Sequence, residues 1–213
     1  MGSVGSYSKP KEFPYWDYDE TDELNNTIDW FNANSNMQSW MANLSDEERN
    51  VLVNYAVYDY IPINELLRYG RLPITYHDSS VEDVSNSIKN IRAAIDNFTL
   101  NKPIIVTRTA NATMLGLDAY AGYNKLSKLI GQEVTPKGFV STNAGGSTTI
   151  ADNLDFVIKV PSGKGIGAYL GNGIGNTGKG ESEFLIKDGF RYKVTNVQRQ
   201  GYGNTVVYLE LLK

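Results

Sequence analysis

Helical periodicity and strand patterns occupy different halves of the chain, and this division constrains the fold more than any other feature of the sequence. Before residue 100, apolar residues recur at helical spacing, most clearly in the segments 19–31 and 81–98. After it come about seven short apolar runs separated by turn residues, the first of them at 103–108. Helices followed by strands predict an α+β fold, with N-terminal helices packed on a β-sandwich core of two sheets.

Two local signals predict how neighbouring elements connect. Pro62 disfavours helical geometry in the residue before it, so one helix is expected to end near Tyr60 and the next to begin at Pro62. The turn Lys187-Asp188-Gly189 is typical of a hairpin. It predicts that the strands at 181–186 and 190–198 pair with each other.

The composition excludes several classes of function. The chain has 213 residues, which fits one domain, and a net charge of -4, which argues against nucleic-acid binding through phosphate neutralisation. It has no cysteine and one histidine, His77, which excludes disulfides, thiolate catalysis and histidine-rich metal clusters. We therefore expect no metal. No apolar run is long enough to span a membrane.

The first residues are expected to differ from the rest of the chain. Residues 1–15 lack periodicity and are expected to form a flexible arm, of which Met1 to Ser6 resembles a cloning remnant. No secretory signal peptide is visible there. Residues 16–213 contain no repeat, linker or low-complexity segment, so they are expected to form a single domain.

A glycine-rich loop at residues 171–180 leads directly into two carboxylates, Glu181 and Glu183. If a strand begins at Glu181, the two carboxylates lie on the same strand face, about 7 Å apart. They repel each other unless a cation approaches, and this suits a reaction in which positive charge develops. A solvated edge strand after a flexible loop is the alternative.

Other polar residues suited to binding an anion stand at the ends of apolar strands or on one helix face. Arg108 ends an apolar strand, where burying its charge is costly unless an anion such as a phosphate pairs with it. Asn64 and Arg68 are four residues apart and so share a helix face, which could hold an anion or could be an ordinary polar surface.

Ser141 and the two carboxylates supply the remaining parts of a specific chemistry. A serine hydroxyl such as that of Ser141 can orient a carboxylate, and that carboxylate can stabilise a sugar oxocarbenium ion. A second carboxylate can accept a proton from the incoming nucleophile. Together with Arg108, these groups suit cleavage of the nicotinamide–ribose bond of NAD and transfer of ADP-ribose.

The order of these pieces resembles a known family. Arg108, Ser141-Thr142-Asn143 and Glu181-Ser182-Glu183 resemble the arginine–serine–glutamate class of mono-ADP-ribosyltransferase toxins. The helical region is similar to that of the clostridial actin-modifying and C3-like enzymes, through Tyr55, Tyr60, Ile63-Asn64 and Leu67-Arg68. The resemblance covers residues 16–213 and implies one catalytic domain with the ADP-ribosyltransferase fold.

The resemblance also implies a role for each residue. Glu183 is expected to be the catalytic glutamate, Glu181 to deprotonate an arginine acceptor, and Ser141 to hold Glu183. NAD, as the substrate, is expected to bind a set of polar and aromatic residues: Arg108, Arg68, Asn64, Tyr60, Thr109 and Thr142. Residues 171–180 are expected to recognise the target.

The sequence departs from the family pattern in three places. Asn143 stands where the family usually has serine, and Thr149 and Asp152 stand near the positions of a phenylalanine and an arginine that clamp NAD. The 171–180 loop lacks the aromatic residue that relatives use on their targets. NAD hydrolysis, transfer to another residue type, and a catalytically decayed binding module are therefore the alternatives to arginine transfer.

The resemblance further implies where the protein acts and on what. A secreted monomer that acts in the host-cell cytosol is expected. Its partner is then a host protein, with a small GTPase or actin among the candidates, and neither nucleic acid nor a membrane span is expected.

Overall fold

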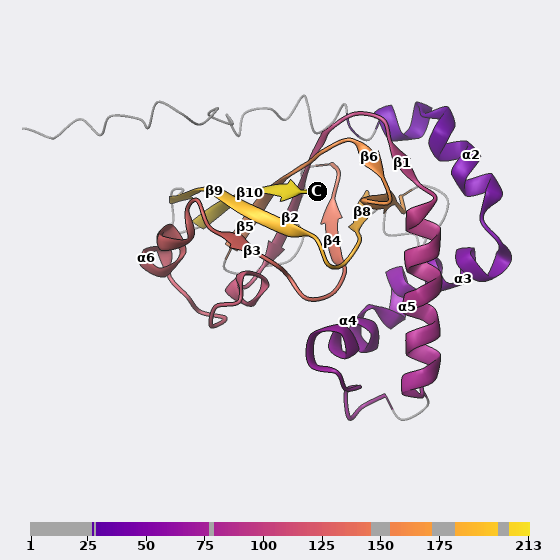
Figure 1. Ribbon diagram of the computed structural model, residues 1–213, viewed down its shortest axis with the longest axis horizontal. Coiled ribbons are helices and arrows are strands. Elements are labelled where there is room, and N and C mark those ends of the chain that lie inside the picture. Colours follow the sequence, from indigo (N-terminus) through magenta and orange to yellow (C-terminus); the bar gives the residue numbers. More distant parts are fainter. Residues whose placement is uncertain (1–26, 28, 77–78, 146–153, 172–181, 200–204) are drawn as a thin grey trace, which may run out of the picture.

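A computed structural model of the chain describes residues 27, 29–76, 79–145, 154–171, 182–199 and 205–213. Residues 29–33 are helical, and the helices that follow come in the order predicted for the N-terminal half (Figure 1). They are α2 (Ser35–Asn43), α3 (Asp46–Asn54), the π-helix η1 (Tyr55–Asp59), α4 (Tyr60–Tyr69) and α5 (Val81–Asp96). Three short helices lie among the strands: η2 (Ala112–Leu115), α6 (Tyr123–Leu126) and η3 (Ser127–Leu129). The predicted arm at 1–15 lies outside the described residues.

Strands dominate the second half of the chain. The described residues form a sheet of eight strands in the order β3-β9-β10-β5-β2-β4-β8-β7, and a separate pair, β1-β6. The strands of the large sheet are β2 (Ile104–Ala110), β3 (Glu133–Val134), β4 (Val140–Asn143), β5 (Leu154–Val160), β7 (Gly167–Tyr169), β8 (Glu183–Ile186), β9 (Arg191–Arg199) and β10 (Thr205–Leu212). The small pair consists of β1 (Thr99–Leu100) and β6 (Gly163–Lys164).

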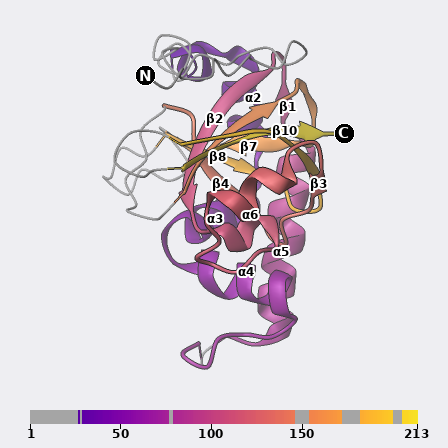
Figure 2. The same cartoon turned by 90° about the vertical axis from the view of Figure 1, so that its left-hand side faces the viewer.

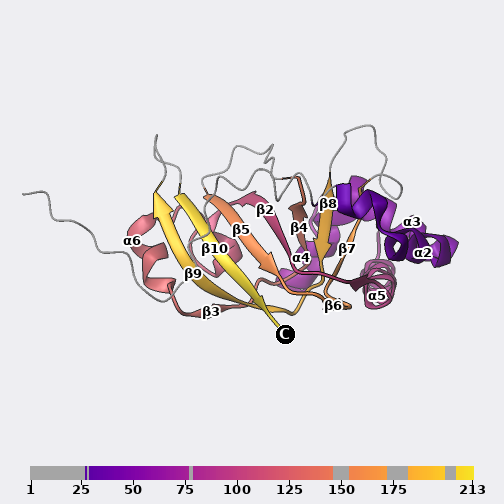
Figure 3. The same ribbon diagram turned by 90° about the horizontal axis from the view of Figure 1, so that it is seen from above.

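The large sheet has two parts with a weak junction between them. In the described register, β2 and β4 are joined by the one pair Thr107↔Asn143, whereas β2 and β5 pair along seven residues. The two predicted sheets are thus joined through one residue pair, and the α+β prediction is confirmed. Figure 3 shows the N-terminal helices beside β7 and β8, and α6 at the opposite end beside β9.

The core lies between this sheet and the N-terminal helices. The buried face of α5 has helical spacing, because it contains Val84, Ile88, Ile91, Ala94 and Ile95. Trp40 of α2 donates its indole N–H to the Ala94 carbonyl over 2.9 Å, so α2 is anchored to α5. In Figure 2, α4 and the end of α5 near it extend below the sheet.

The predicted helix boundary at Pro62 is wrong, because α3, η1 and α4 form one uninterrupted helical run. A proline at this position removes the bond that its N–H would give the carbonyl four residues earlier, that of Tyr58. The Tyr58 carbonyl instead accepts the Tyr76 hydroxyl over 3.2 Å. The π-helical turn η1 lies directly before α4, which allows the helix to continue past the proline.

The predicted hairpin after β8 is also wrong, although its turn is present. Gly189 has φ +87°, the left-handed conformation that such a turn requires. However, β8 pairs with β4 and β7, while β9 pairs with β3 and β10. The chain therefore leaves one end of the sheet at this turn and enters the other.

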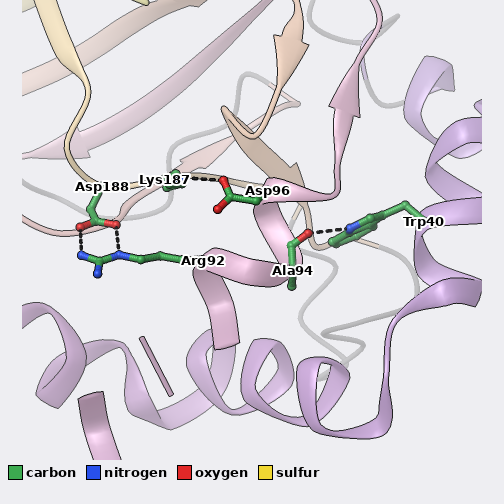
Figure 4. A network of polar contacts seen from close by, with 6 residues as sticks. All are labelled: Trp40, Arg92, Ala94, Asp96, Lys187 and Asp188. Carbon is green, nitrogen blue, oxygen red and sulfur yellow. Dashed lines mark hydrogen bonds and ion pairs between the residues drawn. The ribbon is translucent and has the colours of Figure 1, made fainter. Parts of the chain in front are cut away.

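Ion pairs to α5 hold this turn (Figure 4). Arg92 binds Asp188 through two hydrogen bonds, one from Nε at 2.9 Å and a shorter one from Nη2. Lys187 pairs with Asp96 at the end of the same helix. Because Lys187 directly follows β8, these contacts fix the end of the strand that begins with Glu183 against α5.

Removing the Arg92 side chain should destabilise the protein measurably. The Asp188 side chain is 11% exposed, so in Arg92→Ala a largely buried carboxylate loses its charged partner. We expect the free energy of unfolding, measured by urea denaturation, to fall by about 1–3 kcal/mol. Lys125→Ala is the control, because both side chains of its 3.4 Å pair with Asp118 are exposed. An equal loss in the two variants would contradict a stabilising role for the α5 contact.

Candidate active site

The strands β4 and β8 bring the predicted serine and glutamate to one face of the sheet. Asn143 lies directly opposite Glu183, and Ser141 opposite Leu185. Residues opposite one another in antiparallel strands share a face, and a diagonal neighbour is about 7–8 Å away between Cα atoms. Ser141 is therefore a diagonal neighbour of Glu183, and all three polar residues are half-buried.

Asn143, where the sequence departs from the family pattern, has a structural contact. Its side-chain oxygen accepts the Gly145 N–H over 2.6 Å, which makes a side-chain turn directly after β4. Serine makes turns of this kind more weakly than asparagine. Asn143 thus stabilises the end of the strand that carries Ser141.

Arg108 reaches the same place from β2. Its Nη1 donates a 2.5 Å hydrogen bond to the carbonyl of Ser141, so the guanidinium crosses the weak junction between β2 and β4. The next residue, Thr109, is largely buried, and its hydroxyl donates to Asp155 over 2.8 Å. Of these two predicted NAD ligands, only Arg108 has a described contact with β4.

The helix α4 supplies Asn64 and Arg68, which share one face as their spacing predicts. Asn64 is 7% exposed and donates from Nδ2 to the Tyr55 hydroxyl over 3.1 Å, while Arg68 donates from Nε to the Lys137 carbonyl over 3.1 Å. Both side chains face Gly138, where a Cβ would lie 2.5 Å from Asn64 Oδ1. Gly138 has φ +100°, so both space and backbone conformation require glycine there.

A pocket of about 360 Å³ opens between α4, the end of β2 and residues 135–140. Arg68, Arg108 and Lys137 line it, together with Asn111 and Thr113 at η2. No carboxylate is among its lining residues in the described chain. Three cations without a lining carboxylate make the pocket suited to a polyanion such as a pyrophosphate.

Two buried polar atoms outside the lining of this pocket are still able to form hydrogen bonds. Within the described residues, Asn64 Oδ1 and the Tyr192 hydroxyl are the buried side-chain polar atoms that have no hydrogen-bond partner. The side chains of Asn64 and Arg68 both lie against Gly138. Burial raises the pKa of Tyr192, and the positive charge of Arg108 opposes that rise. Unpaired buried groups are rare in proteins, and binding of a ligand is one explanation for them.

The pKa of Tyr55 responds to both the carboxylate and the cations. Burial is the main cause that raises the pKa of Tyr55, and the negative charge of Glu183 raises it further. The hydrogen bond from Asn64 and the charges of Arg108 and Arg68 lower it. Tyr55 is thus a neutral phenol at physiological pH. Glu183, both arginines and Asn64 all lie within electrostatic reach of this one hydroxyl.

Several predicted site residues are not brought together in this way. Thr142 is buried on the opposite face of β4, and its hydroxyl donates to the Phe184 carbonyl over 2.6 Å. Tyr60 is 47% exposed at the start of α4. The NAD-binding roles of Thr142, Tyr60 and Thr109 stay predictions. Four predicted features lie outside the described residues: Glu181, most of the 171–180 loop, Thr149 with Asp152, and His77.

The sequence analysis missed Lys137 and the contact of Gly138. Lys137 lines the pocket and gives its carbonyl to Arg68. The sequence Pro136-Lys137-Gly138 indicates a turn with a cation just before the strand that carries Ser141. Tyr55 was part of the resemblance but had no role assigned to it.

Neither metal ligands nor membrane-spanning helices appear in the described residues. The described chain contains no cluster of three or more histidine, aspartate or glutamate side chains able to hold a metal ion. Among its described helices, none is both long enough and apolar enough to cross a bilayer.

Comparison with known proteins identifies the family. A sequence profile described as ADP-ribosyltransferase exoenzyme matches residues 30–212. The chain belongs to the ADP-ribosyltransferase exoenzyme family. Members of this family are ADP-ribosyltransferase toxins that use NAD as a substrate. No match was found among curated protein sequences.

Solved structures of ADP-ribosyltransferase exoenzymes share the fold. BECa, an ADP-ribosylating toxin of a binary enterotoxin of C. perfringens solved with NADH, has a TM-score of 0.74 and 24% identity, over 88% of this chain and 48% of its own. Plx2a, an ADP-ribosyltransferase toxin from Paenibacillus larvae, has a TM-score of 0.67 and 18% identity, over 92% of this chain and 96% of its own. The Clostridium limosum C3 exoenzyme also has a TM-score of 0.67 and 18% identity, over 97% of this chain and 98% of its own. This chain thus spans about half the length of BECa.

Proposed function

We propose that this ADP-ribosyltransferase exoenzyme cleaves the nicotinamide–ribose bond of NAD and transfers ADP-ribose to an arginine side chain of a host protein. The observation that carries the proposal is that Arg108, which lines the basic pocket with Arg68 and Lys137, binds the carbonyl of Ser141, the diagonal neighbour of Glu183 on β8. Such a site has an acidic end for a cationic sugar and a basic end for a pyrophosphate.

The pyrophosphate of NAD fits the basic end. Arg108 and Arg68 present forked donors, and Lys137 adds a third cation at the pocket. Asn64 keeps its Oδ1 without a partner and so can accept a ribose hydroxyl next to the phosphates. With the pyrophosphate held there, the nicotinamide ribose extends toward β4 and β8, where Glu183 lies.

Glu183 acts on the bond that breaks. As the C1′–N bond lengthens, its electron pair passes to the ring nitrogen, and nicotinamide leaves as a neutral molecule. The positive charge remains on the ribose, and the Glu183 carboxylate stabilises it by accepting a hydrogen bond from the 2′-hydroxyl and by electrostatic attraction. Ser141, a diagonal neighbour on the same face, keeps the carboxylate oriented.

Glu181 selects the nucleophile in this proposal. An arginine guanidinium is protonated at neutral pH and attacks C1′ only when it loses a proton. Glu181 accepts that proton, and a new C1′–N bond replaces the broken one. Water depends less on Glu181 as a proton acceptor, because it attacks a fully developed oxocarbenium ion and is present in excess.

Glu181→Gln is therefore expected to separate transfer from hydrolysis. With labelled NAD and agmatine, a free guanidine acceptor, the variant should release nicotinamide slowly and yield at least about 100-fold less ADP-ribosyl-agmatine than wild type. Both products are measured in the same reaction by chromatography. Equal loss of hydrolysis and transfer would refute the division of roles between Glu181 and Glu183.

The setting of the reaction follows from the family. We infer that residues 16–213 act as one catalytic domain, that the protein is a secreted monomer acting in the host cytosol, and that its substrate is a host protein such as actin or a small GTPase. Mass spectrometry of NAD-treated host lysate for ADP-ribosylated peptides tests this. Modification of asparagine, or hydrolysis alone, would replace the arginine assignment.

A further inference from the structure

Tyr169, at the end of β7, lies behind the sheet face that carries Glu183. It is opposite Phe184 in the register of β7 and β8, so both rings lie on the face away from Glu183. The Tyr169 ring stacks on Phe31 of the N-terminal helical segment, with centroids 4.4 Å apart and planes 2° from parallel. Tyr169 is fully buried. It therefore fixes the start of β8 against the helices.

The Tyr169 hydroxyl lies close to Ser182, the residue before Glu183. Burial raises the pKa of Tyr169, and a side-chain hydrogen bond with Ser182 opposes that rise. The backbone around Ser182 is held from two other directions, because the Ala144 N–H donates to the Ser182 carbonyl and the Leu170 N–H donates to the Glu183 carbonyl, each over 2.8 Å. Of these three contacts, the one made by Tyr169 is the only side-chain contact.

Gly171 approaches the same tyrosine from the other end of the connection. A Cβ on Gly171 would lie 2.4 Å from both Cζ and the hydroxyl oxygen of Tyr169. The ring cannot move aside easily, because Phe31 stacks on it and the core surrounds it. Gly171 and Ser182, the residues that flank the segment 172–181, thus contact the same side chain.

We propose that Tyr169 is a positioning residue for catalysis, and that its bond to Ser182 sets the direction in which the Glu183 side chain points. This inference rests on the proposed function in one respect, namely that Glu183 stabilises the oxocarbenium ion. Tyr169 itself touches neither NAD nor the reacting atoms. It acts through Ser182 and through the backbone bonds that hold Glu183, on the face opposite the site.

Tyr169→Phe removes the hydroxyl and keeps the stacked ring. We expect kcat for nicotinamide release to fall by about 5- to 10-fold, the effect of one hydrogen bond, while KM for NAD stays within about twofold. The arginines of the NAD pocket are untouched, which is why KM should not move. Ser182→Ala should have the same effect, and the double variant should be no worse than either single variant.

Two further variants sharpen the test. Gly171→Ala pushes the Tyr169 ring from the opposite side and should lower kcat in the same way. Tyr208→Phe is the matched control, because Tyr208 is also buried and lies on β10, away from β8. Its hydroxyl donates a 3.2 Å hydrogen bond to Gln198 of β9. It should leave both kcat and KM unchanged.

Hydrogen exchange provides a readout that does not depend on turnover. The Ala144 and Leu170 amides should exchange faster in Tyr169→Phe than in wild type or Tyr208→Phe, because their acceptors are the Ser182 and Glu183 carbonyls. Unchanged exchange together with unchanged kcat, or kcat losses that multiply in the double variant, would overturn the proposal. If wild type releases no nicotinamide, the proposed function fails, and the exchange rates alone decide whether Tyr169 fixes this strand.

Discussion

Glu183→Gln should lower kcat for nicotinamide release by on the order of 10³-fold and leave the Kd for NAD within a few-fold, as expected when a group that acts mainly in the transition state is lost. Glutamine has nearly the shape of glutamate but no charge, so it cannot balance the positive ribose. In the proposed function, the dinucleotide is held chiefly at the other end of the site, by Arg68 and Arg108. Both NAD hydrolysis and transfer should disappear together, since they share this bond-breaking step.

The measurement for Glu183→Gln combines single-turnover nicotinamide release with calorimetric binding of NAD. Glu133→Gln is its control, because this exposed carboxylate pairs with Arg191 on the far part of the sheet. Glu133→Gln should change neither quantity. Retained cleavage in Glu183→Gln would remove the catalytic role of this glutamate, and a large loss of NAD binding would show that it acts in ground-state binding.

Arg108→Lys should raise the Kd for NAD by on the order of 10- to 100-fold, since a bidentate guanidinium contact is replaced by a single point charge. Arg108 uses Nη1 to bind the Ser141 carbonyl and also lines the pocket. A lysine ammonium is too compact to serve both sites in this way. The kcat at saturating NAD should fall much less than the affinity.

Isothermal titration with NAD measures the effect of Arg108→Lys directly. Arg191→Lys makes the same exchange at an exposed arginine paired with Glu133, and its Kd should equal that of wild type. An unchanged Kd in Arg108→Lys would exclude Arg108 from the phosphate site. The pocket between α4 and β2 would then have another ligand.

The parts of the site that depend on local spacing were predictable from the sequence. Asn64 and Arg68 share a face because they are one helical turn apart, and the structure places both against Gly138. Ser141 and Glu183 share a sheet face, as a serine that orients a carboxylate requires. The first feature follows from the period of a single helix, whereas the second was predicted from the resemblance and depends on the pairing of β4 with β8.

The features that the sequence did not predict depend on contacts between distant segments. The helix continues past Pro62 because Tyr76, far along the chain, satisfies the Tyr58 carbonyl. The turn before β9 is determined by its own residues, but the partners of a strand are determined by the whole sheet. For this reason β8 pairs with β4 and β7 and not with β9. Lys137 lines the pocket beside Arg68, which belongs to a distant helix and binds the Lys137 carbonyl.

The central claim is that this chain cleaves NAD and passes ADP-ribose to a guanidine. Incubation of wild-type protein with labelled NAD, with and without agmatine, tests it most directly. We predict free nicotinamide in both reactions and labelled ADP-ribosyl-agmatine in the second. Nicotinamide release without labelled agmatine would contradict the arginine assignment. The absence of both nicotinamide release and NAD binding would contradict the enzyme assignment itself.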